Sequence, residues 1–309
     1  MNSDYLIKKN HLSVSFITPT FSRDIERFAL LRRSMNMFAG EIPHLVFVDT
    51  EDLPLFTDRF GKEPGLQLIS TKDILPRKIE TQRAIWRSWK GKIIDRIGWR
   101  VGLNAKFFTG WKLQQIVKLE ALANCETDAA VFLDSDIIFC GSVGVEQFID
   151  AENNVRLLQT NAKNYEDFAF EVSRQILIGG NLLQPANAFN YIHQAPRFLK
   201  RTGITLKAHL EATHKNWYSN FFHQNFPSEY NLLGYAAREL EGYIGYQVEK
   251  SDQGEWCYNV KSKSDLYPCL DLCKKELGNR KFLLIQSNLG IPLSEFFLQT
   301  DALLKSLAR

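Results

Sequence analysis

Short apolar runs alternate with helical patterns through the first half of the chain, and this alternation constrains the fold more than any other feature. Four runs are rich in β-branched and aromatic residues and are short enough for strands: 14–18, 44–48, 66–70 and 129–133. We expect the first strand to end at Pro19, because proline cannot donate to a sheet ladder. Helices are predicted after the first run, with Ser22 or Asp24 as N-cap, and over 110–123. This order predicts an α/β fold with a mostly parallel central sheet flanked by helices.

The second half of the chain, after Gly141, is predicted to be mainly helical. The ranges 206–222 and 228–241 have helical spacing, and 282–286 predicts one more strand. We therefore expect a helical region beside the sheet rather than a second sheet of similar size.

The chain length and composition predict one folded domain. With 309 residues, of which 45% are hydrophobic and 24% charged, the chain can bury a sizeable core. No linker rich in proline, glycine or serine separates the halves, so we predict a single domain over 1–309 with subregions 11–141 and 142–309. No apolar run approaches the ~20 residues of a membrane-spanning helix. No signal peptide or lipidation motif opens the chain, so we expect a cytoplasmic protein.

The five cysteines are an odd set without CxxC spacing. In a chain without a secretory signal, we expect reduced structural thiols. Cys269 and Cys273 could share one helix face, but a two-thiolate metal site needs further ligands, and the sequence offers none at zinc spacing.

Basic residues are concentrated between Pro76 and Lys112. This stretch has ten Lys and Arg residues against two acidic ones, although the net charge of the whole chain is only +3. Such asymmetry indicates an anionic partner. An apolar stripe at helical spacing runs through it: Trp86, Trp89, Ile93 and Ile97. The stretch 76–112 could lie on an anionic membrane surface, or its stripe could pack on the sheet. No nucleic-acid module accompanies the charge, so we expect no nucleic-acid partner.

Three polar clusters directly follow predicted strands, at 18–24, 49–52 and 134–136. Ligands of open parallel sheets bind outside the carboxyl ends of the strands, so we expect these acidic and hydroxyl groups to converge at one sheet edge.

The cluster 134–136 is an Asp-Ser-Asp motif within a strongly apolar stretch. Burying two acids there is costly without a cation or hydrogen bonds. In an extended chain the two carboxylates would point to one face, roughly 6.6 Å apart. One would then bind a divalent cation directly, and the other would reach it through water or contact a sugar hydroxyl. The alternative is that both acids only cap a turn.

Leu133-Asp134-Ser135-Asp136-Ile137 resembles the metal-binding Asp-x-Asp motif of nucleotide-sugar glycosyltransferases with the GT-A fold. Four further segments resemble a bacterial subgroup linked to surface polysaccharide and lipopolysaccharide assembly: 16–21, 111–119, 226–230 and 284–288. The resemblance implies a GT-A-like (Rossmann-like) sheet in which 11–141 binds the nucleotide sugar and 142–309 binds the acceptor.

The resemblance also implies a metal. Asp136 would bind Mn²⁺ or Mg²⁺ against the donor diphosphate, with Asp134 near the ion or the ribose, and the ion would neutralise charge on the departing nucleoside diphosphate. Many GT-A enzymes add a late histidine ligand, whereas the matching strand here ends in Gln286-Ser287-Asn288. Amide and hydroxyl oxygens are poorer ligands than imidazole for Mn²⁺ but are acceptable to Mg²⁺.

For the nucleoside, the resemblance implies Thr18 and Asp49, with Thr20 and Asp24 beside them. For Asp24 a helix N-cap is an equally good interpretation.

Gln114 and Lys118 share one face of the helix predicted over 110–123. A lysine there could meet a donor phosphate as a point charge. The alternative is a solvated helix face.

Glu229 begins the helix predicted over 228–241, and the family pattern makes it the candidate base for an inverting transfer, where it would deprotonate the acceptor hydroxyl. The alternative is a first-turn glutamate that complements the helix dipole.

The motifs of four enzyme classes are absent, so these classes are disfavoured. They are oxidoreductases with a nucleotide cofactor (GxGxxG after the first strand), phosphate-loop NTPases (GxxxxGK[ST]), zincins (HExxH) and serine hydrolases (GxSxG). The resemblance predicts a divalent-metal-assisted, inverting glycosyltransferase of bacterial surface polysaccharide biosynthesis. Its donor would be a nucleoside-diphosphate sugar, uridine-based by family habit, and its acceptor a glycan or lipid-linked glycan. The alternative is a catalytically silent nucleotide-binding or membrane-adapter protein on the same fold.

Overall fold

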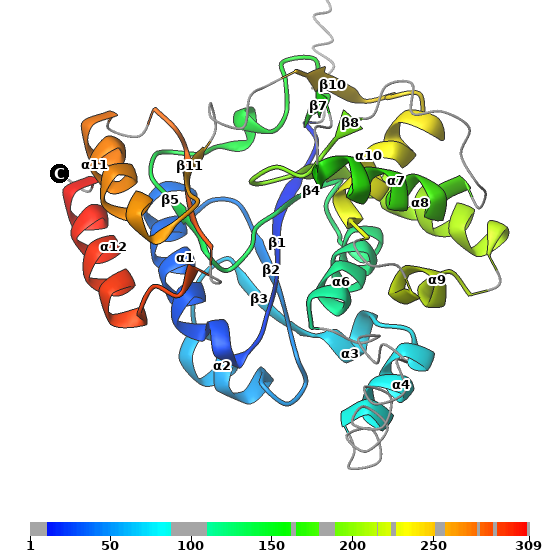
Figure 1. Ribbon diagram of the computed structural model, residues 1–309, viewed down its shortest axis with the longest axis horizontal. Helices are drawn as coiled ribbons and strands as arrows, with labels where there is room; N and C mark the ends of the chain where they lie inside the picture. Colours follow the sequence, from blue (N-terminus) through cyan, green and yellow to red (C-terminus); the bar gives the residue numbers. More distant parts are fainter. Residues whose placement is uncertain are drawn as a thin grey trace, which may run out of the picture.

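The central sheet has five strands in the order β3-β2-β1-β4-β9 (Figure 1). The computed structural model describes residues 11–87, 110–161, 165–178, 189–214, 216–223, 227–250, 257–276, 279–286 and 289–307. The strands of this sheet are β1 (Val14–Thr20), β2 (His44–Val48), β3 (Leu66–Ser70), β4 (Ala129–Phe132) and β9 (Arg197–Leu199). The first four pair in parallel, and β9 is antiparallel to β4. The predicted α/β fold with a mostly parallel sheet is confirmed.

Strand β1 does not end at Pro19, as the sequence had predicted, but continues to Thr20. The backbone N–H of Phe16 donates to Pro43 on the β2 side, so the backbone nitrogen of Pro19 faces the opposite side. On that side the pairing with β4 stops at Ile17. Proline is tolerated there because the ladder that would need its N–H has already ended.

Helices lie on both sides of the central sheet (Figure 1). Those from the first half are α1 (Ile25–Phe38), α2 (Leu53–Phe60), α3 (Thr71–Ile74), α4 (Arg77–Arg87) and α6 (Gly110–Asn124). Those from the second half are α7 (Tyr165–Ile178), α8 (Lys200–Thr213), α9 (Trp217–His223), α10 (Glu229–Glu239), α11 (Leu266–Glu276) and α12 (Leu293–Leu307). In Figure 1, α1, α11 and α12 lie on one side of the sheet, and α6, α7, α8 and α10 on the other.

The helix predicted over 206–222 is two helices, α8 and α9. Helix α8 ends at Thr213 because His214 has an extended backbone, with φ −129° and ψ 123°. Apolar residues on both sides of the break keep similar spacing, so periodicity alone did not reveal it.

Smaller sheets flank the central one. Strands β5 (Ile137–Phe139), β11 (Cys257–Val260) and β12 (Phe282–Ile285) form a three-stranded sheet in the order β11-β12-β5. Two pairs complete the set: β6 (Val155–Leu158) with β10 (Tyr246–Glu249), and β7 (Thr160–Asn161) with β8 (Phe189–Asn190). The second half of the chain is thus less purely helical than predicted.

The described residues form two buried hydrophobic clusters. The larger one surrounds the central sheet and includes residues from Val14 to Phe282. The smaller one, the C-terminal cluster, joins one residue of α1 to the three-stranded sheet, α11 and α12. Its members are Leu30, Ile138, Cys140, Tyr258, Val260, Leu266, Leu270, Cys273, Leu283, Ile285, Ile291, Phe296, Leu303 and Leu304. All five cysteines are free thiols, and only Cys269 is partly exposed.

Most of the basic stretch 76–112 lies outside the described residues, including Trp89, Ile93 and Ile97 and the side chain of Trp86. Its predicted membrane contact therefore stays a prediction. Within the described part of the chain, no helix combines the length and apolar character needed to span a bilayer.

Candidate functional site

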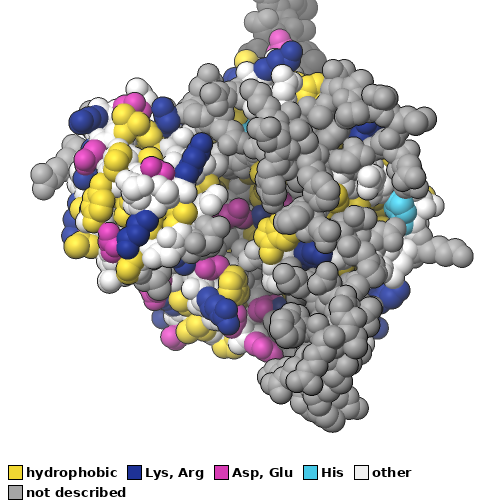
Figure 2. Space-filling view, in the orientation of Figure 1, with side chains coloured by type: hydrophobic (Ala, Val, Ile, Leu, Met, Phe, Trp, Pro, Cys, Tyr) yellow, Lys and Arg dark blue, Asp and Glu magenta, His cyan; other side chains and the backbone are white. Residues whose placement is uncertain are grey.

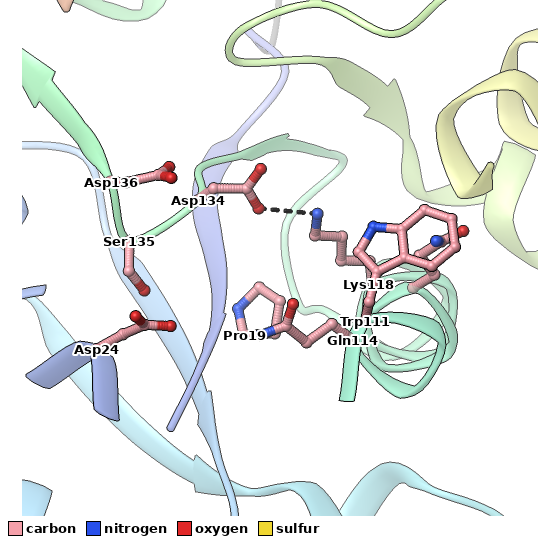
Figure 3. Close-up of a pocket in the computed structure, with 9 residues that line it drawn as sticks. Pro19, Asp24, Trp111, Gln114, Lys118, Asp134, Ser135 and Asp136 are labelled. Carbon is pink, nitrogen blue, oxygen red and sulfur yellow. Dashed lines mark hydrogen bonds and ion pairs between the residues drawn. The ribbon is translucent and has the colours of Figure 1, made fainter. Parts of the chain in front are cut away.

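A pocket of about 160 Å³ opens at the carboxyl ends of β1 and β4 (Figure 3). It is lined by Pro19, Asp24, Trp111, Gln114, Gln115, Lys118, Asp134, Ser135 and Asp136. In Figure 3 the acidic groups and Ser135 lie on one side, and the side chains of α6 face them from the other. This is the strand edge at which the sequence predicted a ligand site. On the face in Figure 2, acidic side chains are visible near the centre, whereas both signs of charge are interspersed over α11 and α12.

The acidic turn 134–136 connects β4 to β5. The N–H of Ile137 donates to the carbonyl oxygen of Asp134 (3.1 Å), so these residues form a turn. The extended geometry assumed from the sequence, with both carboxylates on one strand face, is therefore wrong. The Ser135 hydroxyl donates to the buried hydroxyl of Thr20 (2.9 Å), which ties the turn to the end of β1.

Asp24 reaches the pocket from the start of α1. It occupies the N-cap position, but its side chain makes no capping hydrogen bond and lines the pocket instead. Burial raises the pKa of Asp24; Arg27, 3.8 Å away, opposes the rise and the neighbouring Asp134 adds to it. The pocket thus gathers carboxylates that repel one another and that a cation would stabilise.

Lys118 lies between the pocket and the helical half of the molecule. Its ammonium is 2.9 Å from Asp134 and 2.9 Å from Glu229, and it donates to the Tyr230 hydroxyl (2.7 Å). Its side chain is buried, so the alternative of a solvated helix face is wrong for this lysine. Burial alone would lower the pKa of Lys118, but the Asp134 and Glu229 carboxylates outweigh it and hold that pKa well above its usual value. Lys118 therefore stays charged across the neutral range.

Glu229 begins α10, where the Ser228 hydroxyl accepts a hydrogen bond from the N–H of Asn231 and caps the helix. The Glu229 carboxylate is buried and faces Lys118; it is not among the groups that line the pocket. Burial raises the pKa of Glu229, although Lys118 opposes the rise. A glutamate in the first helical turn is usually solvated, so its burial against a lysine indicates more than a dipole interaction.

The α6 side of the pocket carries one aromatic and two amide side chains. Trp111 is 49% exposed. Gln114, one of the predicted site residues, lines the pocket beside Gln115. Gln115 is 2% exposed, and neither its amide oxygen nor its amide nitrogen has a hydrogen-bond partner among the described residues.

Three predicted nucleoside-binding residues do not line this pocket. Thr18 is buried, and its hydroxyl is hydrogen-bonded to the imidazole of His44 (2.8 Å). Asp49 is ion-paired with Arg83 and also accepts a hydrogen bond from Thr71 (3.2 Å). The Thr20 hydroxyl accepts the hydrogen bond from Ser135 of the pocket wall. The pocket thus brings together Asp24, Gln114, Lys118, Asp134 and Asp136, whereas Thr18, Thr20, Asp49 and Glu229 are not among the residues that line it.

The pocket's oxygen ligands suit a hard divalent cation. Asp24, Asp134 and Asp136 supply carboxylates to one space, and such ligands are the ones that Mg²⁺ and Mn²⁺ take. Among the described residues, however, no three Asp, Glu, His or Cys side chains lie close enough to hold an ion by themselves. A cation here would need oxygens from a ligand. That fits Mg²⁺, which is commonly bound by one or two carboxylates together with substrate phosphates.

Sequence reasoning missed Trp111, Gln115 and Tyr230 as participants. A signal was present for two of them, because Trp111, Gln115 and Lys118 follow one another at spacings of four and three residues along α6. Tyr230 lies within 226–230, one of the segments that carry the resemblance, but the sequence does not show which helix packs on Lys118.

A family model described as a family of unknown function (DUF6492) matches residues 11–306. None of the curated proteins matches the sequence.

Solved structures with a similar fold include three glycosyltransferases. Mouse xyloside xylosyltransferase 1, in its apo form, is 9% identical at a TM-score of 0.45, with 91% of this chain and 100% of that chain covered. The galactosyltransferase LgtC, in complex with donor and acceptor sugar analogues, is 9% identical at a TM-score of 0.46, with 93% and 95% covered. The bifunctional glycosyltransferase WbbM, in its apo form, is 12% identical at a TM-score of 0.45; all of this chain matches about half (51%) of that one.

Proposed function

The chain belongs to the family of unknown function DUF6492, and we propose that it is a glycosyltransferase that uses a nucleoside-diphosphate sugar. One observation carries the proposal. Three carboxylates, those of Asp24, Asp134 and Asp136, share a pocket at the carboxyl ends of parallel strands with the charged, buried Lys118. Acids that need a cation, beside a cation that can meet phosphate, suit a metal-bound diphosphate at the strand edge where such ligands bind. The sequence resemblance of the Asp-Ser-Asp motif supports the same assignment.

Asp136, with Asp24 and Asp134 beside it, would hold Mg²⁺ or Mn²⁺ together with the diphosphate oxygens of the donor. The ion would neutralise the negative charge that develops on the departing nucleoside diphosphate. The remaining chemistry falls to the protein's own side chains.

Lys118 is held for this chemistry by three contacts, to Asp134, Glu229 and the Tyr230 hydroxyl. Its ammonium borders the pocket, where it can donate to a donor phosphate or sugar oxygen. Because the three contacts fix its position before any ligand binds, the charge needs little reorganisation during the reaction.

Glu229 has two possible roles in this arrangement. Its raised pKa favours proton acceptance, which an inverting transfer requires from a base near the acceptor hydroxyl. Its direct contact is with Lys118, which supports a positioning role. We retain the base role as the proposal for an inverting reaction. The anomeric configuration of the product, read by proton NMR, tests it, since retention would leave Glu229 as a positioning residue.

The wider assignment follows the sequence resemblance. We propose a uridine-based donor, a glycan or lipid-linked glycan acceptor, and a place in bacterial surface polysaccharide assembly in the cytoplasm. Contact with the inner face of the membrane would involve the basic stretch 76–112.

One observation favours a second candidate, a nucleotide-binding protein without catalysis. The Lys118 ammonium already neutralises Asp134, as a metal ion would. If lysine replaces the ion, the pocket could hold a nucleotide without the charge neutralisation that sugar transfer needs.

Calorimetric titration with UDP, GDP and CMP tests the proposal. Each nucleotide is titrated in Mn²⁺, in Mg²⁺ and in chelator, against the wild-type protein and Asp136→Asn. We expect one nucleotide to bind only with metal, and Asp136→Asn to lower sugar transfer about 100-fold or more while the protein stays folded. Asp58→Asn, an exposed change on α2, is the matched control and should bind like the wild type.

Two results would contradict this assignment. Nucleotide binding that is equal in metal and in chelator, without transfer from any donor, would support the silent nucleotide-binding protein. No binding of any nucleotide would remove both candidates.

A further inference from the structure

Gln115 is a buried amide with unused hydrogen-bonding capacity in the wall of the pocket. It is 2% exposed, and both polar atoms of its side chain lack partners among the described residues. A buried polar group without a partner costs free energy, so native proteins keep very few of them. Such a group in a pocket wall indicates a position where a bound ligand supplies the hydrogen-bond partners.

Its neighbours on α6 define what kind of ligand fits. Trp111 is four residues before Gln115 and Lys118 three residues after it, so the three side chains form one stripe along the helix. All three line the pocket, together with Gln114. Trp111 is half exposed, whereas Gln115 and Lys118 are buried. The stripe therefore runs from an aromatic ring at the mouth, past an amide, to a cation beside Asp134.

We propose that this stripe binds the sugar of the donor, with the Gln115 amide donating to one ring hydroxyl and accepting from another. The inference rests on the proposed function and extends it to the residue that recognises the transferred sugar. Trp111 supplies an apolar ring face for the C–H groups of the sugar.

Chemistry favours a sugar over a phosphate at Gln115. A phosphate oxygen only accepts hydrogen bonds, so it would satisfy the amide nitrogen and leave the amide oxygen unpaired. A hydroxyl both donates and accepts, so two neighbouring hydroxyls satisfy both atoms. The size agrees: the cavity of about 160 Å³ is smaller than the ~300–1,000 Å³ of sites that enclose a drug-sized ligand. It suits one part of a nucleotide sugar rather than the whole molecule.

The test measures what the sugar adds to nucleotide affinity. Dissociation constants are measured with Mg²⁺ for UDP and for UDP-glucose, UDP-galactose, UDP-xylose and UDP-N-acetylglucosamine. GDP and GDP-mannose are measured in the same way. The affinity ratio of each nucleotide sugar to its bare nucleotide gives the sugar increment. Gln115→Met removes both hydrogen-bonding atoms at similar volume, and Gln67→Met, an exposed change on β3, is the matched control.

We expect the wild type to show a sugar increment for at least one donor. Gln115→Met should lower that increment about tenfold, as expected for losing two hydrogen bonds to neutral groups, while bare nucleotide affinity stays the same. Gln67→Met should change neither value. The melting temperature of ligand-free Gln115→Met should not fall, because the substitution removes two unpaired buried polar atoms.

Five outcomes would overturn the inference. A sugar increment that survives Gln115→Met would show that the amide does not bind the sugar, and the proposed function would stand. Equal loss of bare nucleotide affinity would assign the amide to the base or the diphosphate. A marked fall in the melting temperature of ligand-free Gln115→Met would assign it to the core. No sugar increment for any donor would also remove the inference, whereas no nucleotide binding at all would remove the proposed function with it.

Discussion

The pocket region buries charged and polar side chains, whereas the C-terminal cluster buries apolar ones. Beside the pocket, Lys118, Glu229 and Gln115 are all buried, and two of the three are charged groups held by each other. The elements around the C-terminal cluster (β5, β11, β12, α11 and α12) bury no charged side chain among their described residues, and the buried Thr300 hydroxyl donates to the Phe296 carbonyl of its own helix. The pocket region thus contains groups whose burial costs free energy, and the C-terminal cluster does not.

This difference suggests that the buried groups beside the pocket serve ligand binding, whereas those of the C-terminal cluster serve stability. Buried ion pairs rarely stabilise a fold more than apolar side chains of the same size would. Their presence beside a pocket is therefore better explained by what they do to a ligand. The C-terminal cluster has no such groups among its members, so we expect its substitutions to change stability alone. The following predictions test that contrast, from the largest expected effect to the smallest.

Lys118→Met should produce the largest effect. It leaves Glu229 buried without its partner, and losing one partner of a buried pair costs about 3–5 kcal/mol. Urea unfolding measures the change, and nucleotide affinity should also be lost. The double variant Lys118→Met/Glu229→Gln should recover much of the stability but not the affinity. A double variant that is as unstable as the single one would mean that packing, not charge, holds the site together.

Leu303→Ala tests the other region. Leu303 is fully buried in the C-terminal cluster, so the cavity should lower the free energy of unfolding by about 3 kcal/mol. Nucleotide affinity at 25 °C should match that of the wild type. Leu298→Ala on the exposed face of the same helix is the matched control and should change little. Weaker nucleotide binding by Leu303→Ala would contradict the expectation that substitutions in the C-terminal cluster change stability alone.

The pocket region should contribute to the pH dependence of stability, whereas the C-terminal cluster should not. Burial raises the pKa of Glu229 above its ordinary value of 4.5. A carboxyl group with a raised pKa in the folded state contributes stability that is present below the unfolded value and lost as pH rises through the folded one. Burial lowers the pKa of His44 and His193, and these groups add the same rise of stability with pH to both proteins. In urea unfolding from pH 4.5 to 8, the stability of the wild type should therefore decline relative to that of Glu229→Gln as pH rises.

Cysteine provides the control in the same pH series. The hydrogen bond with Cys273, together with burial, holds the pKa of Cys140, a member of the C-terminal cluster, well above its usual range. Cys140 therefore stays neutral up to pH 8, so Cys140→Ala should lower stability by about the same amount at every pH. Equal slopes for the wild type and Glu229→Gln would contradict the raised pKa of Glu229.

Ser135→Ala should have the smallest effect. It removes the hydrogen bond that ties the acidic turn to Thr20 and should cost about 1 kcal/mol of stability. Metal-dependent nucleotide affinity should fall a few-fold, because the turn carries Asp134 and Asp136. Ser306→Ala removes a comparable hydroxyl bond within α12 and should leave affinity unchanged. Equal affinity in both variants would mean that Ser135 does not hold the turn in place.

Local patterns predicted the strands well and the side-chain contacts poorly. The runs 44–48 and 66–70 are strands at their predicted bounds, because short β-branched runs between turn residues leave few alternatives. The convergence of Asp24 and Asp134 followed from strand-end topology alone. The partnership of Lys118 with Glu229 did not, since periodicity tells which side chains share a helix face but not which element packs against it. The resemblance implied Thr18 and Asp49 at the site, but it does not show their contacts, which are with His44 and Arg83.

The acidic turn has a mechanical consequence that follows from its place in the chain. It is the covalent joint between β4 of the five-stranded sheet and β5 of the three-stranded sheet. The N–H of Ile285, in the second sheet, donates to the carbonyl oxygen of Asp136 (3.2 Å), whereas Ser135 is bonded to the first through Thr20. A ligand that holds both carboxylates at once would therefore link the two sheets through side chains as well as through the backbone.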